Sequence, residues 1–229
     1  ELIDVYGEGP VFSGGLQVTT TLDSEMQGYA EEAVANRLND PGGPAAALVA
    51  IDPRDGAVRA MYGGKNFATS KVNLATGDGG SGRQAGSAFK PFTLAAAMEQ
   101  GYSLDSQWYG PSPITIQDPE CYTDGAPWEL SNASDSESGT FTLLSATTHS
   151  VNTVYAQVAS AVTPKAIVDV AGRMGIRSPL EPVCSITLGT QAVTPLEMTN
   201  AYATLAARGW RHRASPLERV DTADGETDL

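Results

Sequence analysis

The stretch Gly86-Ser87-Ala88-Phe89-Lys90-Pro91 places a serine and a lysine three residues apart at the start of a long apolar helix. Residues three apart lie on the same face of a helix, so the side chain of Lys90 can lie beside the hydroxyl of Ser87. Serine is a poor nucleophile at neutral pH and needs a neighbouring base. A lysine can be that base when burial or nearby charge favours its neutral form. The spacing therefore indicates a nucleophile and its base.

Spacing alone is weak evidence, because a helix-capping serine followed by a solvated lysine produces the same pattern. Pro91 makes the pattern more specific. Proline lacks an N–H and is tolerated only near the first turn of a helix, so this helix must begin close to Ser87. The free N–H groups and partial positive charge of that turn favour an alkoxide at Ser87 and disfavour a protonated Lys90.

A second motif, Ser150-Val151-Asn152, lies between two helical patterns downstream. Serine and asparagine are both preferred N-caps, so a helix cap is the alternative interpretation of this motif. Because Ser87 and Lys90 are present, we favour a catalytic role for this motif over a helix cap. A hydroxyl can relay a proton between a lysine and a leaving amine, and an asparagine amide can hold a lysine and hydrogen-bond a peptide-like substrate. We therefore predict that Ser150 and Asn152 belong to the same site.

Ordered matches to one family run along nearly the whole chain. The segments that carry them are residues 14–23, 47–53, 56–64, 83–92, 187–190 and 193–198. Ser-x-x-Lys is a signature of penicillin-recognising enzymes. With these segments, the chain resembles the transpeptidase domain of class A (bifunctional) penicillin-binding proteins. Residues 14–23 resemble the connection from the glycosyltransferase half, residues 47–64 the first hairpin, and residues 83–92 the nucleophile segment.

The resemblance implies an α+β fold of the penicillin-binding protein and serine β-lactamase type, with an antiparallel sheet and helices on both sides. Residues 1–22 would be a linker from an absent upstream glycosyltransferase domain, and residues 23–229 the N-terminal part of the transpeptidase domain. The family's third motif, Lys-Thr/Ser-Gly, is absent, since none of the four lysines is followed by it. We therefore expect an incomplete sheet that lacks its last strands. We also expect a C-terminal fragment of the same protein as partner, and a chain that is inactive without it.

The implied function is a peptidoglycan D,D-transpeptidase that works through a serine acyl-enzyme and is acylated by β-lactams. Ser87 would attack a D-Ala–D-Ala stem peptide, Lys90 would take its proton, and Ser150, with Asn152, would pass a proton to the departing D-alanine. No cofactor or metal is implied. A D,D-carboxypeptidase or β-lactamase of the same fold is one alternative. A non-catalytic cell-wall binding or scaffolding module is the alternative of a different class.

Composition limits the classes of function and the cellular locations that fit this chain. Asp and Glu outnumber Lys and Arg by 27 to 14, giving a formal net charge of −13. This argues against nucleic-acid binding, which depends on a basic surface, and gives no support for attachment to anionic lipid. No apolar run is long enough to span a bilayer, and no signal peptide is visible. The resemblance implies the extracytoplasmic face of the bacterial plasma membrane, with a membrane anchor upstream of residue 1.

The two cysteines, Cys121 and Cys184, both lie in polar, proline-containing loop sequence. A disulfide between them is favoured outside the cytoplasm, and two buried free thiols are the alternative. Neither has the CxxC or Cys/His spacing of a metal or redox site.

Hydrophobic periodicity predicts the remaining elements. Helices are expected at residues 23–38, 87–99, 142–148, 152–161, 163–175 and 195–207, and a strand–turn–strand at residues 48–62. Met26, Ala30, Ala33, Val34 and Leu38 form an apolar stripe on the first helix. Thr194 and Glu197 form a capping box. Residues 1–15 are interpreted as an irregular linker and residues 102–139 as an irregular surface excursion in which Trp108 and Trp128 pack the loop.

Two features invite rival interpretations. Residues 77–82 match G-x-G-x-x-G, but a dinucleotide site needs that motif between a strand and a helix of a βαβ unit, so we interpret it as a flexible loop. His149 adjoins Ser150 and is a tempting base. Ser87 already has a lysine partner, so we predict a structural role for His149 and a solvated His212.

Overall fold

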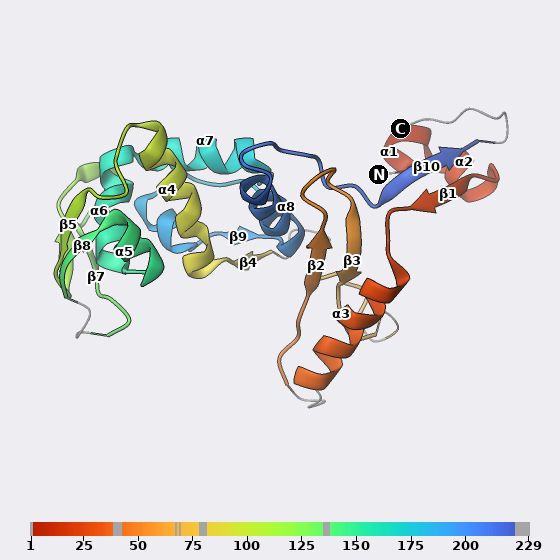
Figure 1. The fold of residues 1–229 in the computed structure, drawn as a ribbon, viewed down its shortest axis with the longest axis horizontal. Coiled ribbons are helices and arrows are strands. Elements are labelled where there is room, and N and C mark those ends of the chain that lie inside the picture. The colour runs from red at the N-terminus through yellow and green to blue at the C-terminus, as the bar shows by residue number, and fades with distance from the viewer. Residues whose placement is uncertain are drawn as a thin grey trace. The chain divides into compact units, whose positions relative to one another are not determined.

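The computed structural model of the protein describes residues 2–38, 43–66, 68, 70–77, 82–134 and 138–222. These form two compact units (Figure 1). The first unit is drawn from residues 1–79 and 199–229, and the second from residues 80–198. All four predicted site residues therefore belong to the second unit. Most of the glycine-rich loop, residues 78–81, lies outside the described residues.

The first unit combines short helices with two small antiparallel sheets, in which β1 pairs with β10 and β2 with β3 (Figure 1). Its elements are α1 (Leu2–Tyr6), α2 (Glu8–Ser13), β1 (Gln17–Thr20), α3 (Ser24–Arg37), β2 (Leu48–Ile51), β3 (Val58–Tyr62) and β10 (Leu217–Asp221). The predicted hairpin at residues 48–62 is confirmed, with Ala50 opposite Ala60. Gly56 turns it with a φ of 82°, and a Cβ there would meet the Arg213 carbonyl oxygen at 2.4 Å, so only glycine fits.

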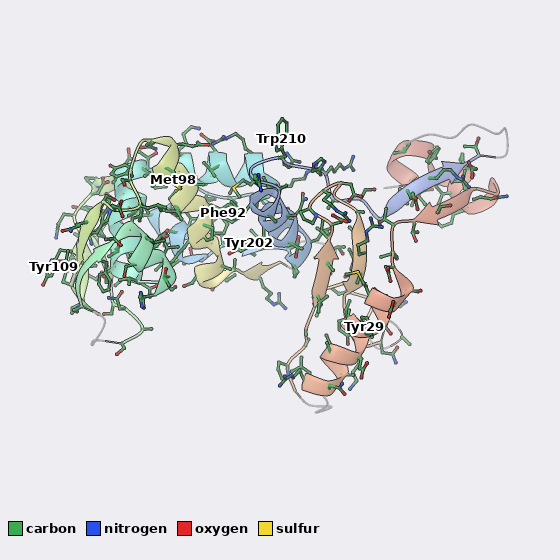
Figure 2. The ribbon with its side chains drawn as sticks, in the orientation of Figure 1. Tyr29, Phe92, Met98, Tyr109, Tyr202 and Trp210 are labelled. Carbon is green, nitrogen blue, oxygen red and sulfur yellow. A yellow bond between two sulfur atoms is a disulfide. The ribbon has the colours of Figure 1, made fainter. Side chains whose placement is uncertain are left out.

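The predicted first helix is confirmed as α3, which packs against β3. The Asp23 side chain caps it by accepting hydrogen bonds from the N–H groups of Glu25 and Met26, at 2.9 and 3.0 Å. The apolar stripe is only partly buried: Ala30 is 5% exposed but Met26 is 41% exposed. Tyr29, labelled in Figure 2, is 59% exposed. Periodicity therefore located the helix but overstated how much of its apolar face is covered within this unit.

The sequence interpretation of residues 1–15 as irregular was wrong, because this segment contains α1 and α2, and β1 begins soon after it at Gln17. In β1, Val18 lies opposite Val220 of β10. A pairing partner two hundred residues away leaves no local signal, so the strand could not be recognised from its own sequence. The division at residue 22 between a linker and a transpeptidase domain stays a prediction.

The second unit is built on helices. They are α4 (Lys90–Glu99), α5 (Leu143–Thr148), α6 (Asn152–Val162) and α7 (Pro164–Met174), with the first residues of α8 (Pro195–Ala206). All of these helices were predicted. α4 lies beside α6 and α7 (Figure 1). Phe92 of α4, labelled in Figure 2, is fully buried, and its ring centroid lies 4.5 Å from that of Phe89.

Residues 102–139 form short antiparallel strands, which corrects the prediction of an irregular excursion. β5 (Gln107–Gly110) pairs with β8 (Gly139–Thr142), and β6 (Ile114–Ile116) pairs with β7 (Trp128–Leu130). Runs of three or four residues, rich in Asp, Ser and Pro, are too short to show a period of two. The tryptophans pack as predicted: the Trp108 ring lies 5.7 Å from that of Tyr102, and Trp128 covers a small core.

That small core contains a disulfide between Cys121 of η2 (Pro119–Cys121) and Cys184 of η3 (Cys184–Leu188), with Cα atoms 5.0 Å apart. Ile116 and Ala156 pack beside it. The disulfide ties the β6–β7 region to η3, which in turn contacts the turn that holds Ser87. No helix among the described residues is long and apolar enough to cross a membrane.

The predicted capping box of α8 is confirmed. Thr194 Oγ1 accepts from the Glu197 N–H at 3.1 Å, and Glu197 Oε2 accepts from the Thr194 N–H at 3.0 Å. The same carboxylate accepts from the N–H groups of Arg177 and Ser178, at 2.8 and 2.7 Å, and from the Ser178 hydroxyl at 2.7 Å. One side chain therefore caps its own helix and anchors the loop after α7.

Glu197→Gln is expected to lower the free energy of unfolding at neutral pH by roughly 1–2 kcal/mol, because an amide keeps one acceptor oxygen where the carboxylate offers two. Burial alone would raise the pKa of Glu197, but hydrogen bonds from Ser178, Thr194 and Arg177 outweigh it and hold that pKa below its ordinary 4.5. This stability is present above about pH 4.5 and lost as the pH falls through the folded-state pKa. Urea unfolding from about pH 7 to about pH 3 should show a smaller acid-dependent loss in Glu197→Gln than in wild type, because the variant keeps only the contributions of the other carboxyl groups. Identical pH dependence in both proteins would contradict the assignment.

Candidate active site

Ser87 lies in η1 (Gly86–Phe89), a 3₁₀ turn that leads directly into α4. We predicted one helix from Ser87, whereas the α-helix begins at Lys90 and Pro91 lies in its first turn. The Lys90 N–H donates to the Ser87 carbonyl oxygen. Ser87 is exposed, whereas Lys90 is only 2% exposed. Ser87 is therefore accessible to solvent, whereas the amine that contacts its hydroxyl belongs to a buried residue.

Backbone contacts with η3 hold this turn in place. The Gly86 N–H donates to the Gly189 carbonyl oxygen at 3.3 Å. Gly189 has a φ of 66°, and a Cβ on it would lie 2.2 Å from the Gly86 carbonyl oxygen. A side chain at Gly189 would therefore push the two segments apart. Below the turn, the buried hydroxyls of Thr93 and Thr187 hydrogen-bond at 2.8 Å.

The Ser150-Val151-Asn152 motif lies between α5 and α6. Ser150 adopts a left-handed conformation with φ 58°, which is uncommon for a residue with a side chain. This turn directs both its hydroxyl and its carbonyl oxygen at Lys90. Val151 is fully buried and anchors the junction, and Asn152 is the first residue of α6.

Lys90 Nζ lies at the centre of the four predicted residues. It is 2.7 Å from Ser87 Oγ and 2.7 Å from Asn152 Oδ1. Ser150 contributes two further acceptors, Oγ and the carbonyl oxygen, each at 2.9 Å. The structure therefore brings together residues that are up to 65 positions apart in the sequence, and all of them meet at one amine.

The acceptors around Lys90 are of two kinds. The Ser150 carbonyl oxygen and Asn152 Oδ1 can only accept, whereas the hydroxyls of Ser87 and Ser150 can accept or donate. A neutral amine has two N–H groups and one lone pair. If the two N–H groups go to the oxygens that only accept, the lone pair faces the two hydroxyls. This arrangement suits an amine that takes a proton from one hydroxyl and returns it through the other.

The amide of Asn152 has one orientation that satisfies both neighbours. Its Oδ1 accepts from Lys90, and its Nδ2 donates to the Ser131 carbonyl oxygen at 3.3 Å. The Ser131 carbonyl oxygen can only accept, so a flipped amide would lose this bond and would also withdraw the acceptor oxygen from the Lys90 N–H. The chain segment at Ser131 therefore decides that oxygen, and not nitrogen, faces Lys90.

Tyr155, one helical turn after Asn152, lies beside this cluster. It is fully buried, and the centroid of its ring lies 5.7 Å from Lys90 Nζ. Burial raises the pKa of its phenol, against a smaller opposing effect of the hydrogen bond with Thr147. The ring therefore stays neutral and presents an apolar wall without adding a charge.

His149 and His212 contribute elsewhere. His149 Nδ1 lies 2.9 Å from the Ser145 carbonyl oxygen on its own helix, α5, which agrees with a structural role. His212 is exposed, as predicted for a solvated side chain. Within the described ranges, no three His, Cys, Asp or Glu side chains gather as metal ligands would.

Sequence reasoning missed three contributors: Tyr155, the Ser131 carbonyl group and Asn132, whose side chain accepts from the Thr153 N–H at 3.0 Å. Tyr155 could have been found, because it lies three residues after Asn152 on the same helix face. Ser131 and Asn132 had no such signal, since their partners lie twenty-one residues downstream across two elements.

Two curated proteins are similar in sequence to this chain. Penicillin-binding protein 1A of Mycobacterium tuberculosis is 35% identical over 246 residues, which cover 99% of this chain and 28% of that protein. Penicillin-binding protein 1A of Neisseria meningitidis serogroup A is 32% identical over 236 residues, covering 93% of this chain and 29% of that protein. The chain thus spans under a third of the length of these curated relatives.

The fold is shared with a solved structure. The PonA1 protein of Mycobacterium tuberculosis in complex with penicillin V superposes with a TM-score of 0.84 at 35% identity, covering 100% of this chain and 61% of that one. The partial coverage agrees with the incomplete sheet expected from the sequence. The family description "Penicillin binding protein transpeptidase domain" matches residues 46–222. The chain therefore belongs to the penicillin-binding protein transpeptidase domain family.

Proposed function

We propose that this chain carries the nucleophile half of a serine D,D-transpeptidase that cross-links peptidoglycan stem peptides. One observation carries the proposal: Lys90 Nζ lies 2.7 Å from Ser87 Oγ and 2.9 Å from Ser150 Oγ, so one amine touches two hydroxyls. This is the contact that a base needs to take a proton from one group and deliver it to another.

In the acylation step, Ser87 Oγ attacks the carbonyl carbon of a D-Ala–D-Ala bond while its proton moves to the neutral amine of Lys90. The backbone N–H of Ser87 supplies one donor for the oxyanion that forms. The carbon–nitrogen bond then breaks. Ser150 gives its proton to the departing D-alanine nitrogen and regains one from Lys90, which leaves an ester on Ser87 and a neutral amine again.

In the second step, an amine from a neighbouring stem attacks the ester. Its proton returns through Lys90 to Ser87, an amide cross-link forms, and the free serine is restored. A β-lactam would enter the first step because it presents an amide in the same pose. The penicillin complex of the PonA1 protein supports this part of the proposal.

The proposal places Ser87 in the cell envelope, outside the cytoplasm, where peptidoglycan stems occur. It also requires a strand with Lys-Thr/Ser-Gly to close the other side of the site and to supply a second oxyanion donor. Residues 1–229 do not contain that motif. We propose that a C-terminal segment of the same protein provides it, and that residues 1–229 alone do not acylate.

The test is to treat the full-length protein with penicillin and locate the adduct by mass spectrometry of its peptides. The adduct is expected on the peptide that contains Ser87, and it should persist for minutes or longer. Turnover of the adduct within seconds would instead indicate a β-lactamase of the same fold. A full-length protein that never forms the adduct would contradict catalysis and favour a non-catalytic cell-wall module.

A further inference from the structure

The first turn of α6 is capped from outside the helix. Its N-cap residue is Val151, which is fully buried and has no side-chain oxygen to offer. A helix start leaves backbone N–H groups without intrahelical partners. Here the Thr153 N–H, second in the helix, donates to Asn132 Oδ1 at 3.0 Å. Asn132 thus performs the task of an N-cap from twenty-one residues upstream.

The residue before Asn132 holds the helix as well. The Ser131 carbonyl oxygen accepts from Asn152 Nδ2, the amide whose oxygen faces Lys90. Two consecutive residues of one loop therefore hold the first two residues of α6, one through the backbone and one through the side chain. Ser131 and Asn132 thus both contact the first turn of α6, which carries Asn152.

The loop is itself fixed. Asn132 is only 8% exposed, and its N–H donates to Ser112 Oγ at 3.0 Å. The Ser112 N–H donates in turn to Ser138 Oγ at 3.0 Å. Asn132 is therefore hydrogen-bonded on one side to Ser112 and on the other to the helix that carries Asn152.

Thr153 contributes only its backbone N–H to the hydrogen bond with Asn132. Its hydroxyl is buried and has no hydrogen-bond partner within the described part of the chain. Replacing this hydroxyl by a methyl group keeps the N–H and the shape of the side chain. The protein therefore offers a matched control for any variant of Asn132.

We propose that Asn132 is a positioning residue for acylation of Ser87: it caps α6 and so holds Asn152 and Ser150 within hydrogen-bond distance of Lys90. The inference rests on the proposed function, because it names a further residue for the same reaction. Without the Asn132 side chain, the Thr153 N–H loses its partner and the first turn of α6 is free to shift. A small displacement of a positioned group is costly in catalysis.

The test compares three variants of the full-length protein by the kinetics of acylation with fluorescent penicillin. Asn132→Ala is expected to lower the rate constant of the acylation step at least about tenfold with little change in the dissociation constant of penicillin. Asn132→Asp keeps an acceptor for the Thr153 N–H, and aspartate caps helices as well as asparagine. In alkaline buffer, where a nearby carboxylate no longer keeps Lys90 protonated, this variant should recover most of the rate. Thr153→Val should acylate at the wild-type rate.

Folding is separated from positioning by circular dichroism and by the labelled fraction at saturation. Asn132→Ala should reach the same saturation as wild type, only more slowly. The inference is overturned if Asn132→Ala acylates at the wild-type rate, if Asn132→Asp loses as much rate as Asn132→Ala in alkaline buffer, or if Thr153→Val slows equally. In each of these outcomes wild type still forms the Ser87 adduct. Absence of that adduct in wild type is the different result that would contradict the proposed function.

Discussion

Lys90→Met is expected to lower the rate constant for acylation of Ser87 by penicillin by about 10³- to 10⁴-fold, within the range that general-base catalysis contributes. Methionine fills a similar volume, so the buried site around Lys90 keeps its packing. It offers no basic nitrogen to the Ser87 hydroxyl, which lies 2.7 Å from Lys90 Nζ, and no N–H to the oxygens of Ser150 and Asn152. The measurement is the time course of fluorescent-penicillin labelling of the full-length protein.

Two further variants serve as controls for this experiment. Ser87→Ala removes the nucleophile and sets the unlabelled baseline. Lys165→Met removes a lysine that is exposed and paired with Asp169 on α7, so it controls for the loss of one positive charge. Labelling of Lys90→Met at a rate close to that of Lys165→Met would show that Lys90 is not the base.

The sequence predicted this cluster because its members belong to short motifs. Ser87 and Lys90 share a helix turn, and their spacing fixes that they meet. Ser150 and Asn152 stand on either side of a buried valine, so both lie at the same junction between helices. The meeting of the two motifs has no local signal, since nothing in either segment brings residue 150 to residue 87. That prediction rested on the chemistry the two motifs share and was strengthened by the family resemblance.

The helices from α3 to α8 were also predictable, because each has a periodic pattern or a start or stop signal, whereas α1 and α2 were not predicted. Asp23 before α3 and Thr194 before α8 are such signals, and both side chains cap their helices. The strands of residues 102–139 and the pairing of β1 with β10 were not predictable. Their stability depends on partners far along the chain, and single strands of three to five residues have little pattern of their own.

Asn132 shows the same limit at the site itself. An asparagine in a loop of Ser, Asn and Asp is an ordinary turn residue by sequence. Its importance arises only when the fold brings it to a helix whose own N-cap position is occupied by a buried valine, Val151. The apolar residue that packs the junction and the polar residue that caps the helix cannot be the same residue, so the cap comes from elsewhere.

Asn152→Asp is expected to slow acylation at neutral pH by about 10- to 1,000-fold, although the side chain changes by only one atom. A carboxylate 2.7 Å from Lys90 Nζ would favour the ammonium form, which cannot accept a proton. An opposite charge at such a distance shifts a titration by about 1–3 pH units. The acid limb of the pH profile of acylation should therefore move to higher pH by that amount, and the rate should recover in alkaline buffer.

The direction of this shift distinguishes a charge effect from lost geometry. Asn152→Ala also removes the acceptor oxygen, but it adds no negative charge, so it should slow acylation without moving the acid limb to higher pH. The carboxylate in Asn152→Asp would also face the Ser131 carbonyl oxygen, where the amide now donates a hydrogen bond. That repulsion persists at high pH, so the recovery should stop below the wild-type rate. An acid limb that stays in place in Asn152→Asp would mean that no proton leaves or reaches Lys90 in the rate-limiting step, and the base would have to be sought elsewhere.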